Sequence, residues 1–368
     1  MKHSLTGLAI AAILATPMVA QAESTVYGRI HMSVDQVTAP TAADKTKTAT
    51  DTAVNGSAPR ANTLGVRGSE DTSFMGMKAI YQFEIGLDTD RNTANTDPAT
   101  GNTALNTKGK PDVQPGLYYQ RDTWFGLQSD ELGSLRAGTM ATSYKQTGKL
   151  VDPFFTTALE GRGVGFQSGL HSGNGDGKGR QTRTVRYDSP SIAGAKIIVA
   201  NNAVNNKEDN MNLGIHYGAG PIKAFVDHII LGKSVSKDKT GAAVAAADGT
   251  ATKLGLQYAG GPVTVGFDYE MDGGALGGFK SSAANHTFVN VAYKMGMTDI
   301  ALSYGMRDDS GAETGGVKKK DGQSGWGLGA IHSIAKKTAL YAGYGTVTPN
   351  DSQVKETTIF TIGMNHAF

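Results

Sequence analysis

The chain of 368 residues carries 35 Lys and Arg against 33 Asp and Glu, a formal net charge of +2, and contains no Cys. This near-balance of charge argues against a nucleic-acid partner, because such a partner requires a basic surplus on the protein. The lack of Cys excludes disulfides, a thiolate nucleophile and a thiolate metal site.

The first 22 residues have the layout of a secretory signal peptide. Lys2 precedes an apolar run from Leu8 to Leu14, and Ala20-Gln21-Ala22 forms an A-x-A cleavage site. We therefore expect export with cleavage after Ala22, which leaves 23–368 as a single domain. No later window approaches the 18 consecutive apolar residues of a transmembrane helix. An exported chain of this kind is a soluble β-rich protein or a closed membrane barrel.

Segments with strictly alternating polarity recur from the start of the expected mature chain to its end. In the first of them Val26, Ile30 and Val34 share one face, and Arg29 and Asp35 lie on the other. Alternation of this kind is typical of a strand with one apolar face. We predict sixteen strands: Thr25–Asp35, Thr63–Glu70, Met77–Leu87, Arg121–Gln128, Ser134–Thr142, Arg183–Ser189, Ala195–Val204, Met211–Tyr217, Ile222–Leu231, Thr252–Tyr258, Val263–Met271, His286–Tyr293, Asp299–Arg307, Gly325–His332, Thr338–Thr346 and Lys355–Phe368.

The connections between these strands alternate in length. Seven are short: 71–74, 130–133, 189–194, 218–221, 259–262, 294–297 and 334–337. The eight between them are longer and polar: 36–62, 88–120, 143–182, 205–210, 232–251, 272–285, 308–324 and 347–354. Short turns at one rim and long loops at the other are typical of a bacterial outer-membrane barrel, whereas a soluble sandwich has no reason to sort its loops.

Aromatic residues near the strand ends support the same interpretation, because transmembrane barrels carry aromatic girdles at both membrane interfaces. The candidates are Tyr81, Phe83, Phe125, Tyr187, Tyr258, Phe267, Tyr269, Tyr293, Tyr304, Trp326 and either Tyr341 or Tyr344. The fold predicted from these patterns is an all-β, sixteen-stranded antiparallel transmembrane barrel with short periplasmic turns and long extracellular loops.

Five stretches, in order along the chain, carry a resemblance to a known family: "VYGRIHMSVD", "TLGVRGSEDTSFMGMKAIYQFEIG", "RDTWFGLQSDELGSLRAGTM", "RTVRYDSPSIAGAKIIVA" and "IGMNHAF". They resemble the general diffusion porins of β-proteobacteria and their neisserial relatives. The resemblance implies a homotrimeric porin of the Gram-negative outer membrane, without a cofactor, whose third loop folds into the lumen. It also implies that the terminal aromatic, Phe368, is a signal read by the barrel-assembly machinery.

Alternation also assigns the charged side chains that face the lumen. The inward bases are Arg29, Arg67, Lys78, Arg136, Arg186, Lys196, Lys223, Lys253 and Arg307, and the inward acids are Asp35, Glu84, Asp227, Asp268 and Glu270. Arg121 is ambiguous, because strict alternation places it with the apolar Phe125. Nine bases against five acids predict a basic lumen and a weakly anion-selective channel, since the sign of lumen charge sets ion selectivity.

The arginines concentrate on strands that neighbour the base of the long connection 143–182. If this loop folds inward, we expect it to narrow the channel against a basic wall formed by Arg29, Arg67, Arg136 and Arg186. The loop carries two acids, Asp152 and Glu160, that would face this wall. Phe154 and Phe155 would fix the loop by burial against the barrel.

We therefore predict a channel for passive diffusion of ions and small hydrophilic solutes, surrounded by lipid and lipopolysaccharide. Two alternatives remain open at this stage. A soluble exported binding protein or adhesin would use the same alternating strands. A barrel hydrolase would need a nucleophile or an acid–base set at the extracellular rim. No G-x-S-x-G motif occurs, and the eight His residues form no zinc-binding pair.

Overall fold

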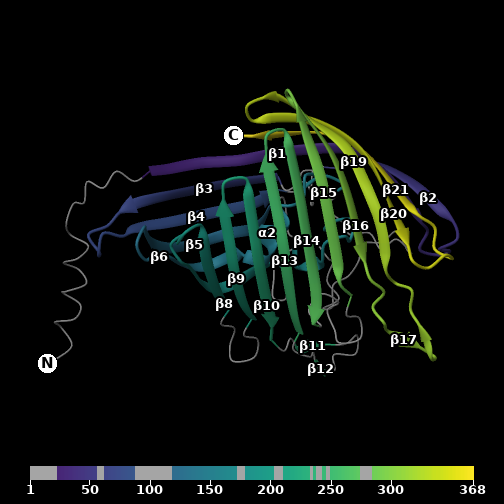
Figure 1. The fold of residues 1–368 in the computed structure, drawn as a ribbon, viewed down its shortest axis with the longest axis horizontal. Helices are drawn as coiled ribbons and strands as arrows, with labels where there is room; N and C mark the ends of the chain where they lie inside the picture. Colours follow the sequence, from purple (N-terminus) through teal and green to yellow (C-terminus); the bar gives the residue numbers. More distant parts are fainter. Residues whose placement is uncertain are drawn as a thin grey trace.

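The computed structural model describes residues 23–55, 62–87, 118–171, 179–202, 210–232, 235–237, 243–245, 249–273 and 284–368 (Figure 1). The expected signal peptide at 1–22 lies outside the described residues. In the described part, seventeen strands belong to one sheet, and sixteen of them form the wall of a closed antiparallel barrel. The predicted fold class is therefore confirmed.

The wall strands follow one another in chain order. They are β1 (Glu23–Pro40), β3 (Asn62–Asp71), β4 (Lys78–Leu87), β5 (Tyr118–Ser129), β6 (Gly133–Ala141), β7 (Arg180–Asp188), β8 (Ala195–Asn202), β9 (Asn210–Ala219), β10 (Ile222–Leu231), β13 (Gly249–Gly260), β14 (Val263–Gly273), β15 (His286–Met295), β16 (Thr298–Arg307), β19 (Gln323–Ala335), β20 (Thr338–Pro349) and β21 (Thr357–Ala367).

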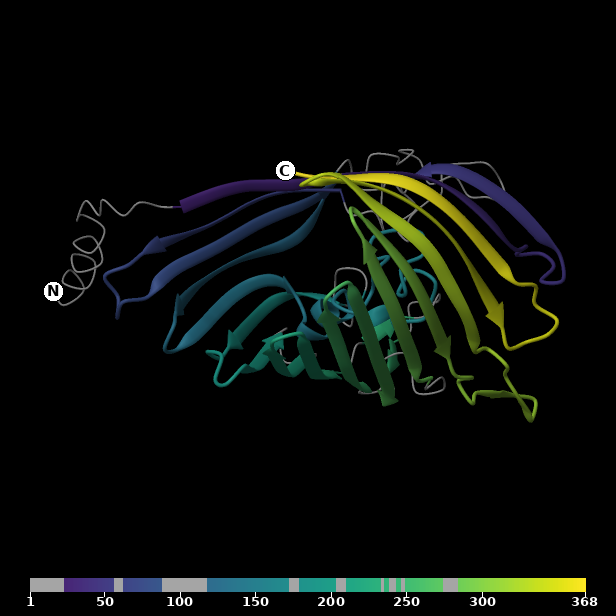
Figure 2. The same cartoon turned by 45° about the horizontal axis from the view of Figure 1, so that its top comes forward.

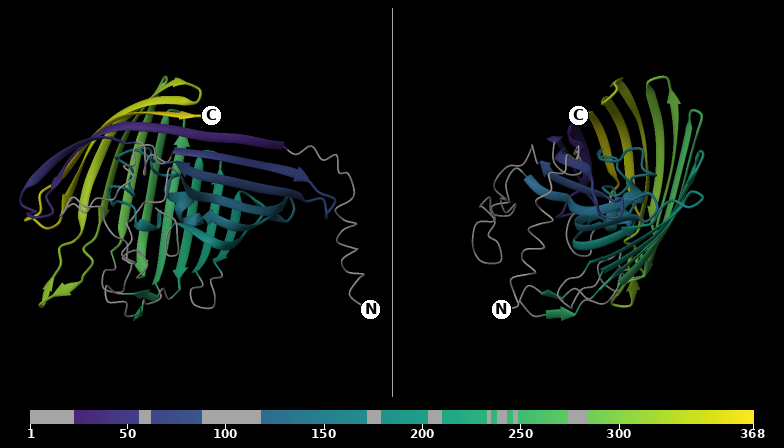
Figure 3. Two further views of the ribbon diagram at one scale, coloured as in Figure 1. Left: turned by 180° about the vertical axis from the view of Figure 1, so that it is seen from behind. Right: turned by 90° about the vertical axis from the view of Figure 1, so that its left-hand side faces the viewer.

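The barrel closes where β1 meets β21. Their antiparallel register runs from Arg29 opposite Ala367 to Thr38 opposite Thr358. The first and last strands lie side by side in two views (Figures 1 and 3). Closure leaves every wall strand paired on both sides, so no wall edge exposes unpaired backbone groups to lipid.

One strand of the sheet was not predicted. β2 (Thr48–Asn55) lies within the connection expected at 36–62 and pairs with the outer part of β1, from Ser33 opposite Asn55 to Pro40 opposite Thr48. Both of its faces carry polar residues, because Thr, Asp and Asn fill five of its eight positions. Alternation of polarity could not find it for that reason. The first long loop therefore begins as a hairpin that extends the wall.

Four short elements lie in the long loops. β11 (Val235–Lys237) pairs with β12 (Ala243–Ala245), and β17 (Glu313–Thr314) pairs with β18 (Val317–Lys318). None of the helices in the described part is long and apolar enough to cross a membrane.

The outer face of the wall is apolar, as the alternation predicts. On β1, the outward Val26 and Ile30 are 62% and 55% exposed, whereas the inward His31 and Asp35 are 1% and 3% exposed. The same outward series continues around the barrel with Leu64, Phe83, Phe125, Leu135, Val185, Ile215, Val226, Leu256, Phe267, Val291, Leu302, Leu328, Phe360 and Ile362. A wall that is apolar outside and polar inside suits lipid around a water-filled lumen.

Exposed aromatic side chains lie near both ends of the strands. Beside the short turns these are Tyr187, Tyr217, Tyr258 and Tyr293, and beside the long loops they are Tyr304, Trp326 and Tyr344. The sequence left Tyr341 and Tyr344 as alternatives. Tyr344 faces outward, whereas Tyr341 is buried at 7% exposure and bonds the His31 ring at 2.9 Å.

The connection between β6 and β7 enters the barrel. It begins with the short helix α2 (Ser143–Gly148), which Thr142 caps by accepting a hydrogen bond from the Lys145 backbone, and contains the 3₁₀ turn η1 (Gly169–His171). Figure 2 shows this teal segment in the space enclosed by the strands. Its apolar side chains pack on the lumen faces of strands across the barrel, and we call its described residues, 142–171 and 179, the lumen loop.

Candidate pore constriction

Apolar anchors hold the lumen loop against the wall formed by β10 to β21. Tyr144 packs with Ile229 of β10 and Ala251 of β13. Farther along the loop, Phe166 packs with Phe288 of β15. Each of these burials removes apolar area from water, which stabilises the inward path of the loop.

Of the two anchors that the sequence predicted, Phe154 is buried against the barrel, whereas Phe155 is half-buried beside Arg162. Phe154 is 3% exposed and clusters with Leu159 of the loop, Ala301 of β16 and Ile359 of β21. Its ring occupies the space over Gly329, where an added Cβ would lie 2.8 Å from the ring. The glycine of β19 thus makes room for the loop.

Charged groups of the same wall form a second set of anchors. Glu270 of β14 accepts hydrogen bonds from the Tyr144 hydroxyl at 2.7 Å and from the Ser168 backbone at 2.9 Å. Asp268 accepts one from Gln167 at 2.7 Å, and Asp227 of β10 accepts one from Thr147 at 2.5 Å. All three carboxyl groups are fully buried.

Lys253 of β13 lies at the centre of these acids and is also fully buried. Its ammonium bonds the backbone oxygen of Tyr144, approaches the His171 ring nitrogen at 2.9 Å and lies 4.4 Å from the Tyr144 ring centroid. Burial lowers the pKa of His171 to about 3, so the ring is neutral and accepts from the lysine. The sequence assigned Lys253, Asp227, Asp268 and Glu270 to lumen charge, but in the structure they hold the loop.

The opposite wall, β1 and β3 to β8, carries the arginines that face the open side of the lumen. Arg136 of β6 and Arg186 of β7 share Asp188, with their closest nitrogen–oxygen distances at 2.7 and 2.6 Å. Arg186 also donates to the Gln146 amide of α2 at 3.0 Å. The sequence missed Asp188, although alternation places it on the same face as Arg186.

A β-bulge determines the direction of the Arg121 side chain, which the sequence left ambiguous. β4 pairs with β5 at Phe83–Thr123 and again at Ile85–Gln120, so Arg121 and Asp122 together oppose the single residue Glu84. A bulge of this kind breaks the alternation of side chains. Arg121 therefore turns inward and forms an ion pair with Glu84.

The neighbouring acid of the bulge, Asp122, pairs with Arg180 of β7 at 2.5 Å and accepts from the Ala141 backbone at 3.1 Å. Arg180 lies at the exit of the lumen loop and is 3% exposed. The sequence singled out neither residue. A second irregularity between Gly138 and Met140 displaces the β6–β7 register there, which strict alternation could not anticipate.

Three further predicted bases occupy different levels of the wall. Arg29 reaches the lumen loop, with 3.4 Å between its guanidinium and the Thr156 hydroxyl. Arg67 is exposed, and its guanidinium carbon lies 5.0 Å from the Tyr27 ring centroid. Neither forms an ion pair within the described residues. Lys78 pairs with Asp71 at 3.6 Å beside a short turn, away from the lumen loop.

The two loop acids take a different position from the expected one. Asp152 is buried within the loop, where it accepts from the backbones of Phe154 and Gly161, both at 2.9 Å. Glu160 accepts from the Thr156 backbone at 2.9 Å. Both acids therefore shape the loop itself rather than charge its lumen face, which corrects the expected arrangement of loop acids opposite an arginine wall.

The loop also carries two basic residues at this level, Arg162 and Lys145. Arg162 pairs with Glu160 at 2.8 Å and lies 4.6 Å from the Phe155 ring centroid. Burial, with repulsion from Arg180, Arg162 and Arg121, lowers the pKa of Lys145 to about 6. At neutral pH the Lys145 amine is therefore mostly uncharged, and the cationic groups around it are the arginines. No group of three His, Cys, Asp or Glu residues in the described part could hold a metal ion.

Comparisons with known proteins match this architecture. The curated major outer membrane protein P.IB of Neisseria sicca is 29% identical over 198 residues, 53% of this chain and 45% of its own length, so the match spans less than half of that relative. Two solved structures share the fold: an anion-selective porin from Comamonas acidovorans (18% identity, TM-score 0.68, 95% of this chain and 100% of the other) and the Salmonella typhi OmpF complex with daunomycin (12% identity, TM-score 0.65, 94% and 97%).

The profile of the Gram-negative porins covers residues 8–352, nearly the whole chain. That extent includes all the lumen-facing arginines described above and all wall strands except β21. The chain therefore belongs to the Gram-negative porin family.

Proposed function

We propose that the protein is a passive, weakly anion-selective diffusion channel of the outer membrane for ions and small hydrophilic solutes. The observation that carries this proposal is the asymmetry of the lumen. The lumen loop covers the wall from β10 to β21 and buries its acids, which accept hydrogen bonds from the loop. The opposite side carries the arginine wall of Arg29, Arg67, Arg121, Arg136, Arg180 and Arg186, of which Arg180 and Arg186 are buried.

Ion pairing leaves a positive surplus on that wall. Arg121 and Arg180 are each matched by one acid, but Arg136 and Arg186 share the single carboxylate of Asp188. Arg29 and Arg67 add two further charges without a carboxylate partner in the described residues. A surplus of fixed positive charge in a narrow aqueous passage favours anions over cations.

Two competing functions have less support. A soluble binding protein does not account for an apolar band around the whole barrel, because contiguous exposed apolar surface of that extent marks contact with lipid or protein. A barrel hydrolase does not follow from family membership, which indicates a non-enzymatic channel.

The assembly of the channel is part of the same proposal. Residues 1–22 act as a signal peptide, the mature barrel forms a homotrimer, and Phe368 is read by the barrel-assembly machinery. Lys318, Lys319 and Lys320, in the long loop between β16 and β19, would contact anionic lipopolysaccharide. An unheated gel that shows a heat-labile trimer would support the proposed oligomer.

Liposome swelling tests the channel. Proteoliposomes should swell in neutral sugars at rates that fall with solute size, because an open lumen admits solutes without specific binding. Protein-free liposomes and liposomes with heat-unfolded protein serve as controls. Equal swelling with and without correctly folded protein would contradict the proposal.

A further inference from the structure

A pocket of about 330 Å³ lies below the arginine wall, at the short-turn end of the lumen. Wall strands β4 to β8 and the turns after β5 and β7 enclose it. The volume is about ten times the ~30 Å³ share of one water molecule in the liquid, which leaves room for a solute of monosaccharide size. A solute that has passed the constriction meets this pocket before it leaves the channel.

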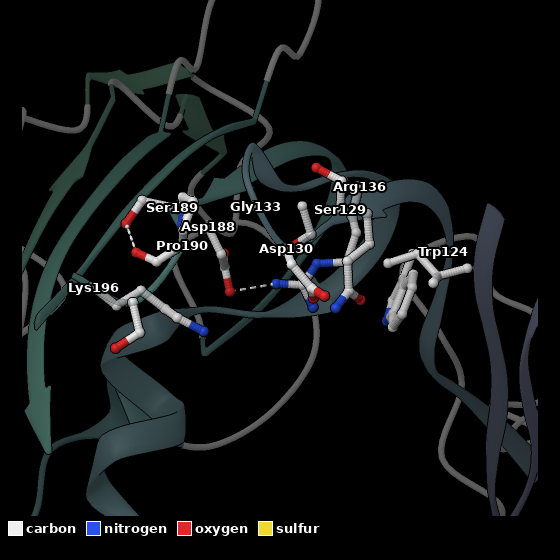
Figure 4. A pocket seen from close by; sticks show the side chains of 13 residues that line it. Trp124, Ser129, Asp130, Gly133, Arg136, Asp188, Ser189, Pro190 and Lys196 are labelled. Carbon is white, nitrogen blue, oxygen red and sulfur yellow. Dashed lines mark hydrogen bonds and ion pairs between the residues drawn. The ribbon is translucent and has the colours of Figure 1, made fainter. Parts of the chain in front are cut away.

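The charges around the pocket sum to a positive field. Figure 4 shows Arg136 on one side, Lys196 on the other and Asp188 between them. Asp188 is already shared by Arg136 and Arg186, so this trio keeps one net positive charge. Lys196 adds a second charge and forms no ion pair within the described residues, whereas the exposed Asp130 at the rim removes one.

Arg136 also keeps hydrogen-bonding capacity. Its Nη2 donates to Asp188 at 2.7 Å, but its Nη1 has no hydrogen-bond partner in the described part of the chain. A carboxylate is the acceptor that fits an arginine fork, and a nearby lysine reinforces it as a point charge.

The rest of the lining is hydroxyl-rich with one large ring. Ser134 and Ser191 line the pocket and make no side-chain hydrogen bond within the described residues, and the amide of Gln128 lies beside them. The Trp124 indole closes one side, held by the Arg136 guanidinium 5.1 Å from its centroid. Free hydroxyls suit a solute with several hydroxyl groups, and an indole suits the C–H face of a sugar ring.

We propose that this pocket is a solute-binding site, on the periplasmic side of the constriction, for small polyhydroxylated carboxylates of the sugar-acid class. Arg136 and Lys196 bind the carboxylate, and Ser134, Ser191 and Gln128 bind the hydroxyls. The site rests on the proposed channel function, because it is reached through the lumen. It adds chemical preference to a passage that otherwise sorts solutes by size and charge.

Single-channel recording with glucuronate as the probe tests the site. Glucuronate added on the short-turn side should interrupt the potassium chloride current in resolved events, whereas glucose, of similar size but neutral, should not. Lys196→Gln should shorten the events about tenfold, the loss expected for one charge-assisted hydrogen bond. Lys223→Gln is the matched control, because Lys223 lies exposed beside a short turn on β10 and does not line the pocket.

The outcomes separate this site from the channel itself. Shortened events with Lys196→Gln and unchanged events with Lys223→Gln would support the site. Equal effects of the two substitutions would overturn it in favour of a general field of the lumen, and open channels without glucuronate events would overturn it while leaving the channel intact. Folded protein that conducts no current would overturn the channel and the site together.

Discussion

The hydroxyl of Tyr144 donates a hydrogen bond of 2.7 Å to Glu270, joining the lumen loop to a wall strand 126 positions away in the chain. Both groups are fully buried. The loop buries the acids of one wall through contacts of this kind. The charge of the open passage is therefore set by the opposite wall.

Tyr144→Phe should loosen the lumen loop without unfolding the barrel. The change removes one hydrogen bond from a buried carboxylate, which costs about 1–3 kcal/mol when the acceptor loses its partner. Thermal unfolding in detergent should therefore start at a lower temperature, and single-channel current should become noisier. Identical melting and identical noise in the variant and the natural protein would contradict an anchoring role.

Gly305→Ala tests the docking of the loop from the side of the wall. An added Cβ on Gly305 of β16 would lie 2.3 Å from the Phe166 side chain, so the loop must shift. Overpacking of this kind costs about 1–3 kcal/mol. We expect altered conductance and a lower melting temperature. Gly218→Ala is the control, because its nearest non-neighbouring atom would be 3.9 Å away, and an equal effect there would contradict the docking.

Asp152→Asn should change how stability depends on pH. Burial raises the pKa of this loop carboxyl from 3.8 to about 7, so the folded state binds its proton over a pH range in which the unfolded state has released it. The carboxyl therefore destabilises the fold increasingly as pH rises through this window. The variant, which has no such proton, should match the natural protein near pH 4.

Near pH 8 the same variant should be more stable than the natural protein by about 4 kcal/mol, because the natural protein must then hold a buried charge. Thermal unfolding of both proteins at the two pH values measures the difference. A stability difference that is the same at pH 4 and pH 8 would contradict the position of Asp152 inside the loop.

The wall could be predicted from the sequence because each strand has one apolar face. Alternation placed all sixteen wall strands and gave the outward direction of residues such as Val26 and Phe360. β2 was missed because both faces of Thr48–Asn55 carry polar residues. A strand that buries neither face in lipid leaves no alternating pattern in the sequence.

The constriction was predictable only in part. Alternation finds which side chains point inward, but it does not show which inward charges meet the loop and which meet water. Lys253 and Arg67 look alike by that rule, yet Lys253 is fully buried against the lumen loop and Arg67 is exposed. Arg121 required the bulge opposite Glu84, a backbone irregularity without a sequence signature of its own.

Phe368→Ala should impair assembly more than conductance. The ring packs over Gly28 of β1, where an added Cβ would lie 2.3 Å from it, and the backbones of the two residues exchange hydrogen bonds of 3.1 and 3.3 Å. We expect less folded trimer in the outer membrane, whereas the channels that do form should conduct normally. Undiminished membrane yield would contradict a role in assembly.

Anion preference is the central claim, and the reversal potential in a salt gradient tests it most directly. In a planar bilayer with potassium chloride at two concentrations, the sign of the potential at zero current should correspond to chloride moving more readily than potassium. Replacing both Arg29 and Arg67 with Gln should move this potential toward zero, because these two arginines carry the charge that no acid in the described part of the chain neutralises. A potential of the cation-selective sign in the natural protein would contradict the account.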